Sequence, residues 1–229
     1  MKTTGTHPDL EILYEDNHLL AICKPSGVLS QEDRTGDPDV LTLGKEYLKK
    51  RYQKPGNVFL GLLHRLDKPV SGVMVMAKTS KSAARISDQI RQRSVKKSYL
   101  AVVKGDPKDF NYLTHNLLKD EAANRVAVVE EGRKGAKRAE LMYQTVDRKD
   151  GLALLKIKLI TGRAHQIRVQ LAEVNLPILG DIKYGQKSDN RIALHAYEFE
   201  LTHPTLKKAI SIQSNPPKVE PWAFFNINV

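Results

Sequence analysis

The chain of 229 residues has a single cysteine, Cys23. One cysteine excludes an internal disulfide and a metal site built from several thiolates. Because Cys23 ends an apolar run that begins at Leu19, we expect it to be a small buried hydrophobic residue and not a reactive thiol.

Long apolar runs are also missing from the chain. No stretch approaches the ~18 continuous apolar residues that a membrane-spanning helix requires. Residues 1–8 contain no apolar segment of the kind found in secretory signals. We therefore expect a soluble, cytoplasmic protein that has no membrane partner.

The motifs of several cofactor-dependent and hydrolytic enzymes are absent as well. The chain has neither a Gly-x-Gly-x-x-Gly segment nor a glycine-rich phosphate loop, and Ser71 does not lie in a Gly-x-Ser-x-Gly segment. The seven histidines include no pair at the i, i+4 spacing of a zinc protease. We expect no metal and no nucleotide cofactor, and serine hydrolysis is poorly supported.

Positive charge, in contrast, is in excess. Lysine and arginine number 37 against 26 acidic residues, a formal net charge of +11. Such a surplus attracts polyanions, and nucleic acid is the leading candidate because neutralised phosphates release counterions. A basic surface that binds nothing is equally compatible with the charge alone.

The pattern of apolar and polar residues predicts one α+β domain with a mixed, mostly antiparallel sheet flanked by helices and loops. Residues 1–9 are expected to be a loose end and residues 10–229 a single domain. Helices are predicted over 40–52, from an N-cap at Ser80 to about residue 93, over 163–175 and, as a short terminal element, from Pro221. Strands are predicted within 10–22 as a hairpin, then at 73–77, 98–103, 112–118, 125–129, 140–146, 152–160, 192–201 and 209–212.

The first candidate site is the segment 62–72. It places His64, Arg65, Asp67, Lys68 and Ser71 between apolar runs, directly before a predicted buried strand. A rigid strand that ends in a polar loop is a usual place for a functional site. A polar turn capped by the aspartate is an equally simple explanation, and composition slightly favours it.

The second candidate is the segment 161–168. If a helix begins at Gly162, its unpaired backbone N–H groups form an anion site, and His165 and Arg168 share one face. A solvated basic face is the simpler alternative. Tyr99 lies in a predicted strand, where a tyrosine is usually a packing residue.

Four blocks of sequence, in order, resemble the RluA-type RNA pseudouridine synthases. The segment His64-Arg65-Leu66-Asp67-Lys68-Pro69-Val70-Ser71-Gly72 resembles the family signature His-Arg-Leu-Asp-x-x-Thr-Ser-Gly. The other blocks are 19–30 with Lys24-Pro25-Ser26-Gly27, 97–105 with the tyrosine, and 161–185 with Gly162-Arg163-Ala164-His165-Gln166-Ile167-Arg168; Leu194-His195-Ala196 matches a later short element.

This resemblance covers about residues 10–201. Val70 stands where threonine is usual, and Gln170 stands where histidine is usual. Many relatives carry an extra N-terminal RNA-binding module of the S4 type, for which the chain has no room before Leu10. Recognition of RNA is therefore expected to rest on the basic surface of the catalytic domain itself.

The resemblance implies an enzyme that isomerises uridine to pseudouridine in ribosomal or transfer RNA, without a cofactor. Nothing in the sequence suggests an obligate oligomer, so we expect a monomer. The resemblance makes Asp67 the essential carboxylate, Arg168 its cationic partner with Arg163 as the competing candidate, and Tyr99 the residue beside the flipped uracil. The residues expected to contact the substrate are His64, Arg65, Arg163, His165 and Gln166. The main alternative is an inactive RNA-binding or RNA-chaperone module of the same fold.

Overall fold

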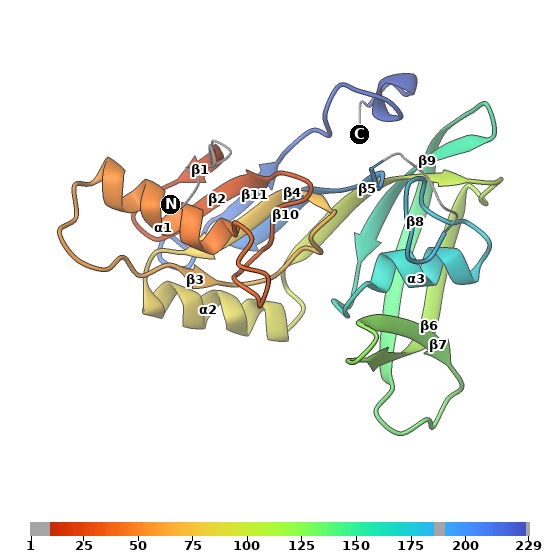
Figure 1. Ribbon diagram of the computed structural model, residues 1–229, viewed down its shortest axis with the longest axis horizontal. Coiled ribbons are helices and arrows are strands. Elements are labelled where there is room, and N and C mark those ends of the chain that lie inside the picture. The colour runs from red at the N-terminus through yellow and green to blue at the C-terminus, as the bar shows by residue number, and fades with distance from the viewer. Residues whose placement is uncertain (1–9, 186–190, 228–229) are drawn as a thin grey trace. The chain divides into compact units, whose positions relative to one another are not determined.

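The computed structural model describes residues 10–185 and 191–227. They form two compact units: unit 1 comprises the described parts of Met1–Ser94 and Phe199–Ser214, and unit 2 those of Val95–Glu198 and Asn215–Val229. The elements of both are labelled in Figure 1. The expected loose end, residues 1–9, lies outside the described residues, and a single domain over 10–229 stays a prediction.

Unit 1 is built on a sheet in which β1 pairs with β2 and β2 pairs with β4, both antiparallel. The predicted hairpin is confirmed, and its turn is fixed by Asp16, whose Oδ1 accepts the N–H groups of His18 and Leu19 at 2.7 Å each. The strands and helices of this unit are β1 (Glu11–Glu15), β2 (Leu19–Lys24), β3 (Gly61–Leu62), β4 (Ser71–Ala77), β11 (Ala209–Gln213), α1 (Val40–Arg51) and α2 (Ser80–Arg91).

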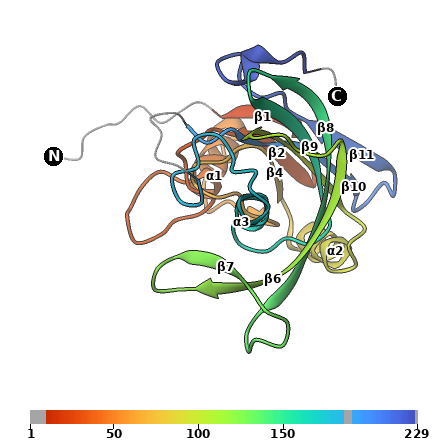
Figure 2. The same ribbon diagram turned by 90° about the vertical axis from the view of Figure 1, so that its right-hand side faces the viewer.

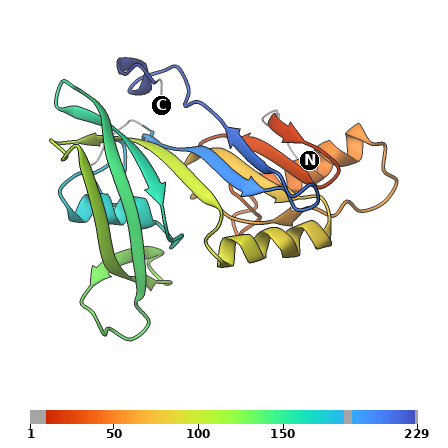
Figure 3. The ribbon, with the colours of Figure 1, turned by 180° about the vertical axis from the view of Figure 1, so that it is seen from behind.

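The helices of unit 1 pack on this sheet. Gly44 of α1 approaches Leu20 and Met76, which are register partners on β2 and β4, so α1 covers the face on which these two side chains lie. Figure 3 shows α2, in yellow, running along the strands of the unit. Helix α2 begins one residue earlier than expected, because Thr79 and not Ser80 is the N-cap and its Oγ1 accepts from Ser82 N at 3.1 Å.

Unit 2 is an antiparallel sheet in the order β5-β9-β8-β6-β7. Figure 2 shows α3 inside the curve of this sheet, where Val169 packs with Leu117, Val126 and Ala139. The elements are β5 (Lys96–Lys104), β6 (Phe110–Asp120), β7 (Arg125–Val129), β8 (Lys137–Lys149), β9 (Leu152–Leu159), α3 (Gln166–Glu173) and the 3-10 helix η1 (Trp222–Phe224). Strand β10 (Leu194–Thr202) begins in unit 2 and ends in unit 1.

The α+β fold with a mostly antiparallel sheet is confirmed, and two further expectations are corrected. Helix α3 begins at Gln166, not at Gly162, because His165 adopts a left-handed backbone with φ of 50° and serves as the N-cap position. Cys23 is only partly buried, whereas the next residue, Lys24, is fully buried. None of the described helices is long and apolar enough to cross a membrane.

Candidate active site

The loop between β3 and β4 carries Asp67. Side chains alternate along it: Arg65 is exposed, Leu66 is buried and Asp67 is half-buried. The Ser30 hydroxyl brackets the backbone of Leu66, because it donates to Leu66 O at 2.7 Å and accepts from Leu66 N at 3.0 Å. Val70 N donates to Asp67 O at 3.0 Å and closes the turn. The backbone that carries the Asp67 carboxylate is therefore fixed on both sides.

Lys24 holds the same loop from inside the unit. Its Nζ donates to Pro25 O at 3.0 Å, to Val28 O at 2.6 Å and to Lys68 O at 3.0 Å. Three acceptors match the three hydrogens of an ammonium group. Burial lowers the pKa of the Lys24 ammonium to about 7, and the negative charge of nearby Asp67 opposes this shift. Lys24 thus joins the turn after β2 to the loop of Asp67.

Two further contacts tie this turn to the loop. Ser26 Oγ donates to Pro69 O at 2.7 Å, and Gly27 N donates to Lys68 O at 2.8 Å. Gly27 has a φ of 89°, which only glycine adopts without strain. The sequence identified this segment as a turn but gave no signal that a lysine in it would be buried against the carboxylate loop.

His64 supports the loop through its ring. Its Nε2 accepts from Val75 N at 3.0 Å, and the ring stacks on Phe199 at a centroid distance of 4.6 Å. These contacts fix the start of the loop to the strand that follows it. A contact of His64 or of exposed Arg65 with the substrate stays a prediction.

In unit 2, Arg168 is buried in an ion pair. Its side chain is 6% exposed and that of Asp181 is 1% exposed, which excludes the solvated basic face that the sequence left open. Arg168 Nε lies 2.8 Å from Asp181 Oδ2, and Arg168 Nη2 lies 2.8 Å from Asp181 Oδ1. Asp181 lies within the block 161–185 of the family resemblance, which assigned it no role. The expected pairing of Arg168 with Asp67, a residue of unit 1, stays a prediction.

The neighbours of Arg168 anchor the loop before α3. Arg163 is exposed, and its Nε donates to Arg138 O at 3.1 Å. Gln166 is buried: its Oε1 accepts from Thr161 Oγ1 at 2.8 Å and from Arg163 N at 2.9 Å, while Nε2 donates to Glu140 O at 3.0 Å. Gln166 therefore connects this loop to β8, and its expected contact with the substrate stays a prediction.

Tyr99 lies in the middle of β5 and is 7% exposed. The end of the same strand is bonded to the segment that leads to Asp181. Lys104 N donates to Pro177 O at 3.1 Å, and Leu179 N donates to Val102 O at 2.9 Å. The strand that carries Tyr99 and the carboxylate that pairs with Arg168 thus belong to one hydrogen-bonded framework.

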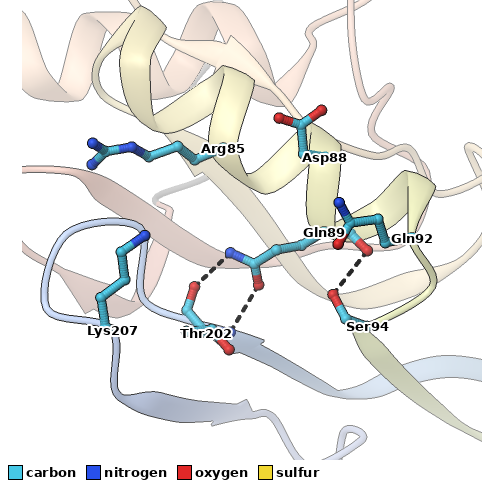
Figure 4. A pocket seen from close by; sticks show the side chains of 7 residues that line it. All are labelled: Arg85, Asp88, Gln89, Gln92, Ser94, Thr202 and Lys207. Atoms are coloured by element: carbon cyan, nitrogen blue, oxygen red, sulfur yellow. Dashed lines mark hydrogen bonds between the residues drawn. The ribbon is translucent and has the colours of Figure 1, made fainter.

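A pocket of about 380 Å³ lies on unit 1, between the end of α2 and the turn from β10 to β11. Gln89 joins the two segments that border the pocket, because its side-chain amide accepts from Thr202 N at 2.9 Å and donates to Thr202 O at 2.7 Å (Figure 4). Arg85 Nη1 donates to Pro204 O at 2.8 Å. The residues that line the pocket are Arg85, Asp88, Gln89, Gln92, Ser94, Thr202 and Lys207.

The charge of this pocket is positive. Asp88 is its one carboxylate, and Arg91 pairs with it at 2.7 Å. In the part of the chain that the structure describes, no carboxylate pairs with Arg85 or with Lys207. Across the same described ranges, no group of three histidine, cysteine or acidic residues is placed to hold a metal ion.

Comparison with known proteins identifies the family that shares these features. The family model described as RNA pseudouridylate synthase matches residues 18–173. Ribosomal large subunit pseudouridine synthase C of Buchnera aphidicola subsp. Acyrthosiphon pisum is 35% identical over 215 residues, which cover 89% of this chain and 66% of that protein. Ribosomal large subunit pseudouridine synthase D of Nitrosomonas europaea is 35% identical over 208 residues, which cover 85% of this chain and 58% of that protein.

Solved structures agree with these relatives. Human RNA Pseudouridylate Synthase Domain Containing 4 superimposes with a TM-score of 0.76 at 25% identity, over 91% of this chain and 89% of that chain. Human RNA Pseudouridylate Synthase Domain Containing 1 has the same fold, with a TM-score of 0.73 at 24% identity over 92% of this chain and 85% of that chain. The chain spans less than two thirds of the length of the two ribosomal relatives named above.

Proposed function

Because the chain belongs to the RNA pseudouridylate synthase family, of the RluA type, we propose that it converts uridine to pseudouridine within RNA. The observation that carries this proposal is the loop of Asp67. It combines the family signature His64-Arg65-Leu66-Asp67 with a backbone held by Ser30 and Lys24 and a carboxylate that remains half-buried. A carboxylate on a fixed backbone with partial access to solvent suits a group that must meet a substrate.

The reaction requires no external reactant. The bond between C1′ of the ribose and N1 of the uracil breaks, the base rotates, and a bond forms between C1′ and C5. The proton of C5 is lost, and N1 gains a proton. The base is both leaving group and returning nucleophile, so the protein needs only to supply a carboxylate, hold the base and move protons.

Asp67 is the carboxylate in this proposal, either by attack on C1′ or by removal of a sugar proton. Both roles require it ionised, and a nearby cation favours the ionised form of a carboxylate. Arg168 is the proposed partner because a guanidinium stays charged and binds carboxylates through two parallel hydrogen bonds. Tyr99 is proposed to lie against the uracil and to assist removal of the C5 proton.

The base must leave its stack before Asp67 can reach the sugar, which costs a few kcal/mol in the RNA. Arg65 is exposed and stands two residues before Asp67 in the same loop. We assign Arg65 the role of filling the space that the base vacates. This assignment predicts that Arg65→Ala weakens turnover on structured RNA more than on an unstructured strand.

Large-subunit ribosomal RNA is the proposed substrate, since several relatives bear that substrate in their names. Transfer RNA is the alternative substrate. Formal charge of +11 supports capture of either RNA by this chain's own surface. The protein is also proposed to be a monomer and to act in the cytoplasm, where ribosomal RNA is modified.

Purified protein tests the proposal directly. Ribosomal RNA transcribed with tritium at uridine C5 should release tritium with the wild-type chain and not with Asp67→Asn, because the C5 proton is lost only when the new bond forms. RNA binding by the variant, measured by filter retention, should stay within threefold of wild type. Tritium release by Asp67→Asn would overturn the role of Asp67, and absence of release by both proteins on ribosomal and transfer RNA would favour the inactive RNA-binding alternative.

A further inference from the structure

Arg168 is held by more than one partner in unit 2. The Asp181 carboxylate meets its Nε and Nη2 atoms in two parallel bonds of 2.8 Å each, an arrangement that fixes the plane of the guanidinium. The remaining donors of the guanidinium lie on Nη1 and on the far edge of Nη2. Asp181 therefore determines the direction in which those donors point.

Asp181 is itself fixed in its charged form. Its Oδ1 accepts Lys183 N at 3.0 Å and Tyr184 N at 3.2 Å. Burial alone would raise the pKa of the Asp181 carboxyl, but Arg168 and these two N–H groups bring the pKa below its ordinary value. A side chain at Gly185 would place its Cβ 2.8 Å from Asp181 O, so the tight turn around the carboxylate requires glycine at that position.

The ring of Tyr184 forms the second support. The guanidinium of Arg168 lies over it at 5.3 Å, within the range of a cation–π contact, and that of Arg125 lies over it at 5.4 Å. The Tyr184 hydroxyl accepts Val126 N at 2.8 Å and lies 2.7 Å from His165 Nδ1. The ring is thus held at its hydroxyl end by β7 and by the residue that precedes α3.

These contacts matter because the charge of Asp67 changes during the proposed reaction. As a nucleophile Asp67 becomes a neutral ester, and as a base it becomes a neutral acid. A buried arginine that depended on Asp67 alone would then lose its counter-ion, which is strongly unfavourable in a buried environment. Asp181 is not on the reaction path, so its charge compensates Arg168 at every step.

We propose that Asp181 is a permanent counter-ion and positioning residue for Arg168, and that Tyr184 fixes the same guanidinium through its ring. The inference rests on the function proposed above, specifically on the role of Arg168. It adds two residues that touch neither the sugar nor the base and that act through Arg168. It predicts loss of the chemical rate with little loss of RNA affinity.

Single-turnover tritium release with Asp181→Asn and Asp181→Glu tests the proposal. Both variants should lower the rate constant by ten- to a hundredfold while the dissociation constant for RNA changes less than threefold. Asp181→Glu keeps the charge and displaces it by one methylene group, so it tests geometry in a folded protein even if Asp181→Asn is unstable. Tyr184→Leu should lower the rate several-fold, and Tyr184→Phe, which keeps the ring, should recover most of that loss.

A double-mutant cycle separates positioning from general stability. In the Arg168→Met background, Asp181→Asn should reduce the rate by less than twofold, because the group that it positions is already gone. Glu15→Gln is the matched control: it breaks the ion pair of Lys78 with Glu15 in unit 1, at 2.7 Å between side chains that are each 9% exposed, and should lower thermal stability without lowering the rate of the folded protein.

Three outcomes overturn the proposal. If Arg168→Met lowers the rate but folded Asp181→Glu does not, Asp181 does not position Arg168. The same follows if the rate losses of Arg168→Met and Asp181→Asn multiply when the two substitutions are combined. If Arg168→Met leaves the rate unchanged while Asp67→Asn abolishes it, the assigned role of Arg168 fails and the role of Asp181 fails with it. If Asp67→Asn is fully active, the proposed function fails instead.

Discussion

The loop of Asp67 and the surroundings of Arg168 each stabilise a buried cation, but by different kinds of partner. In the loop, the Lys24 ammonium is bound by three backbone carbonyl groups, which are neutral dipoles. Around Arg168, the cation is bound by a full carboxylate, Asp181. The three carbonyl groups therefore leave the positive charge of Lys24 without a counter-ion among its hydrogen-bond partners. The charge of nearby Asp67 favours the ammonium form of Lys24.

The loop of Asp67 is thus organised for shape, and the surroundings of Arg168 are organised for charge. Hydrogen bonds to three carbonyl groups make Lys24 a tether between the turn after β2 and the loop of Asp67. This tether does not depend on a charged partner. A bidentate ion pair makes Asp181 a determinant of both the charge and the direction of Arg168. Disruption of the ion pair should therefore act on the chemical rate, and disruption of the tether should act mainly on stability.

After the loss of activity in Asp67→Asn, the largest expected effect is that of Arg168→Met. Removal of the guanidinium should lower the rate of pseudouridine formation about a thousandfold, or about 4 kcal/mol of barrier, because it removes the proposed stabilisation of the Asp67 carboxylate. Binding of RNA should change little. Arg163→Met is the control, since Arg163 is exposed and bonded to a carbonyl; a large rate loss in that variant alone would show that the wrong arginine has been assigned.

Lys24 should make stability depend on pH. Its pKa is about 7 in the folded protein and 10.5 in the reference state. Between these values the unfolded chain binds a proton that the folded chain has released, so the free energy of unfolding should rise with pH, by on the order of a few kcal/mol in total. Below pH 7 the contribution is constant. Urea titrations of wild type and Lys24→Met from pH 6 to about 10 should show a difference that grows with pH; a constant difference would contradict the assignment.

At neutral pH, Lys24→Met should destabilise the protein by about 2 kcal/mol. The buried carbonyl groups of Pro25, Val28 and Lys68 lose a donor, and relief from burying the ammonium offsets part of that loss. Urea unfolding monitored by circular dichroism gives the value. Lys50→Met, at an exposed lysine of α1, is the matched control and should change stability by less than about 0.5 kcal/mol. Equal effects of Lys24→Met and Lys50→Met would show that the hydrogen bonds of Lys24 do not stabilise the loop.

The smallest expected effect concerns the pocket beside α2. The double substitution Arg85→Gln and Lys207→Gln should weaken RNA binding three- to tenfold and reduce the slope of log affinity against log salt by about 1, because exposed cations contribute through phosphate contacts. Lys108→Gln with Lys149→Gln removes the same charge from exposed positions in unit 2 and should have a smaller effect. Identical losses in the two double variants would mean that net charge, and not this pocket, attracts RNA.

The sequence predicted the elements well because their apolar periodicity is strong. The hairpin of β1 and β2, the long helices and the strands of unit 2 were all located to within a few residues. The start of α3 was misplaced because the left-handed backbone of His165 is not encoded in an apolar pattern. Cys23 and Lys24 were ranked by hydrophobicity, whereas three carbonyl acceptors decided which of them is buried.

The candidate site was only partly visible in the sequence. Asp67 and Arg168 were singled out because a family motif marks them. Asp181, Tyr184 and Ser30 act through contacts between segments that are distant in the chain or on opposite sides of a turn, and no local spacing reports such contacts. Gln170, which replaces the usual histidine, is fully buried, and among the described residues its Oε1 atom has no hydrogen-bond partner, which nothing in the structure explains.

Mapping of pseudouridine in cells is the most direct test that this protein isomerises uridine by means of Asp67. Total RNA is compared between cells that lack the protein and cells that express either the wild-type chain or Asp67→Asn at equal abundance. At least one uridine, in large-subunit ribosomal RNA, should be isomerised only with the wild-type chain. A site that is modified equally well with Asp67→Asn, or no site that depends on the protein in any RNA, would contradict it.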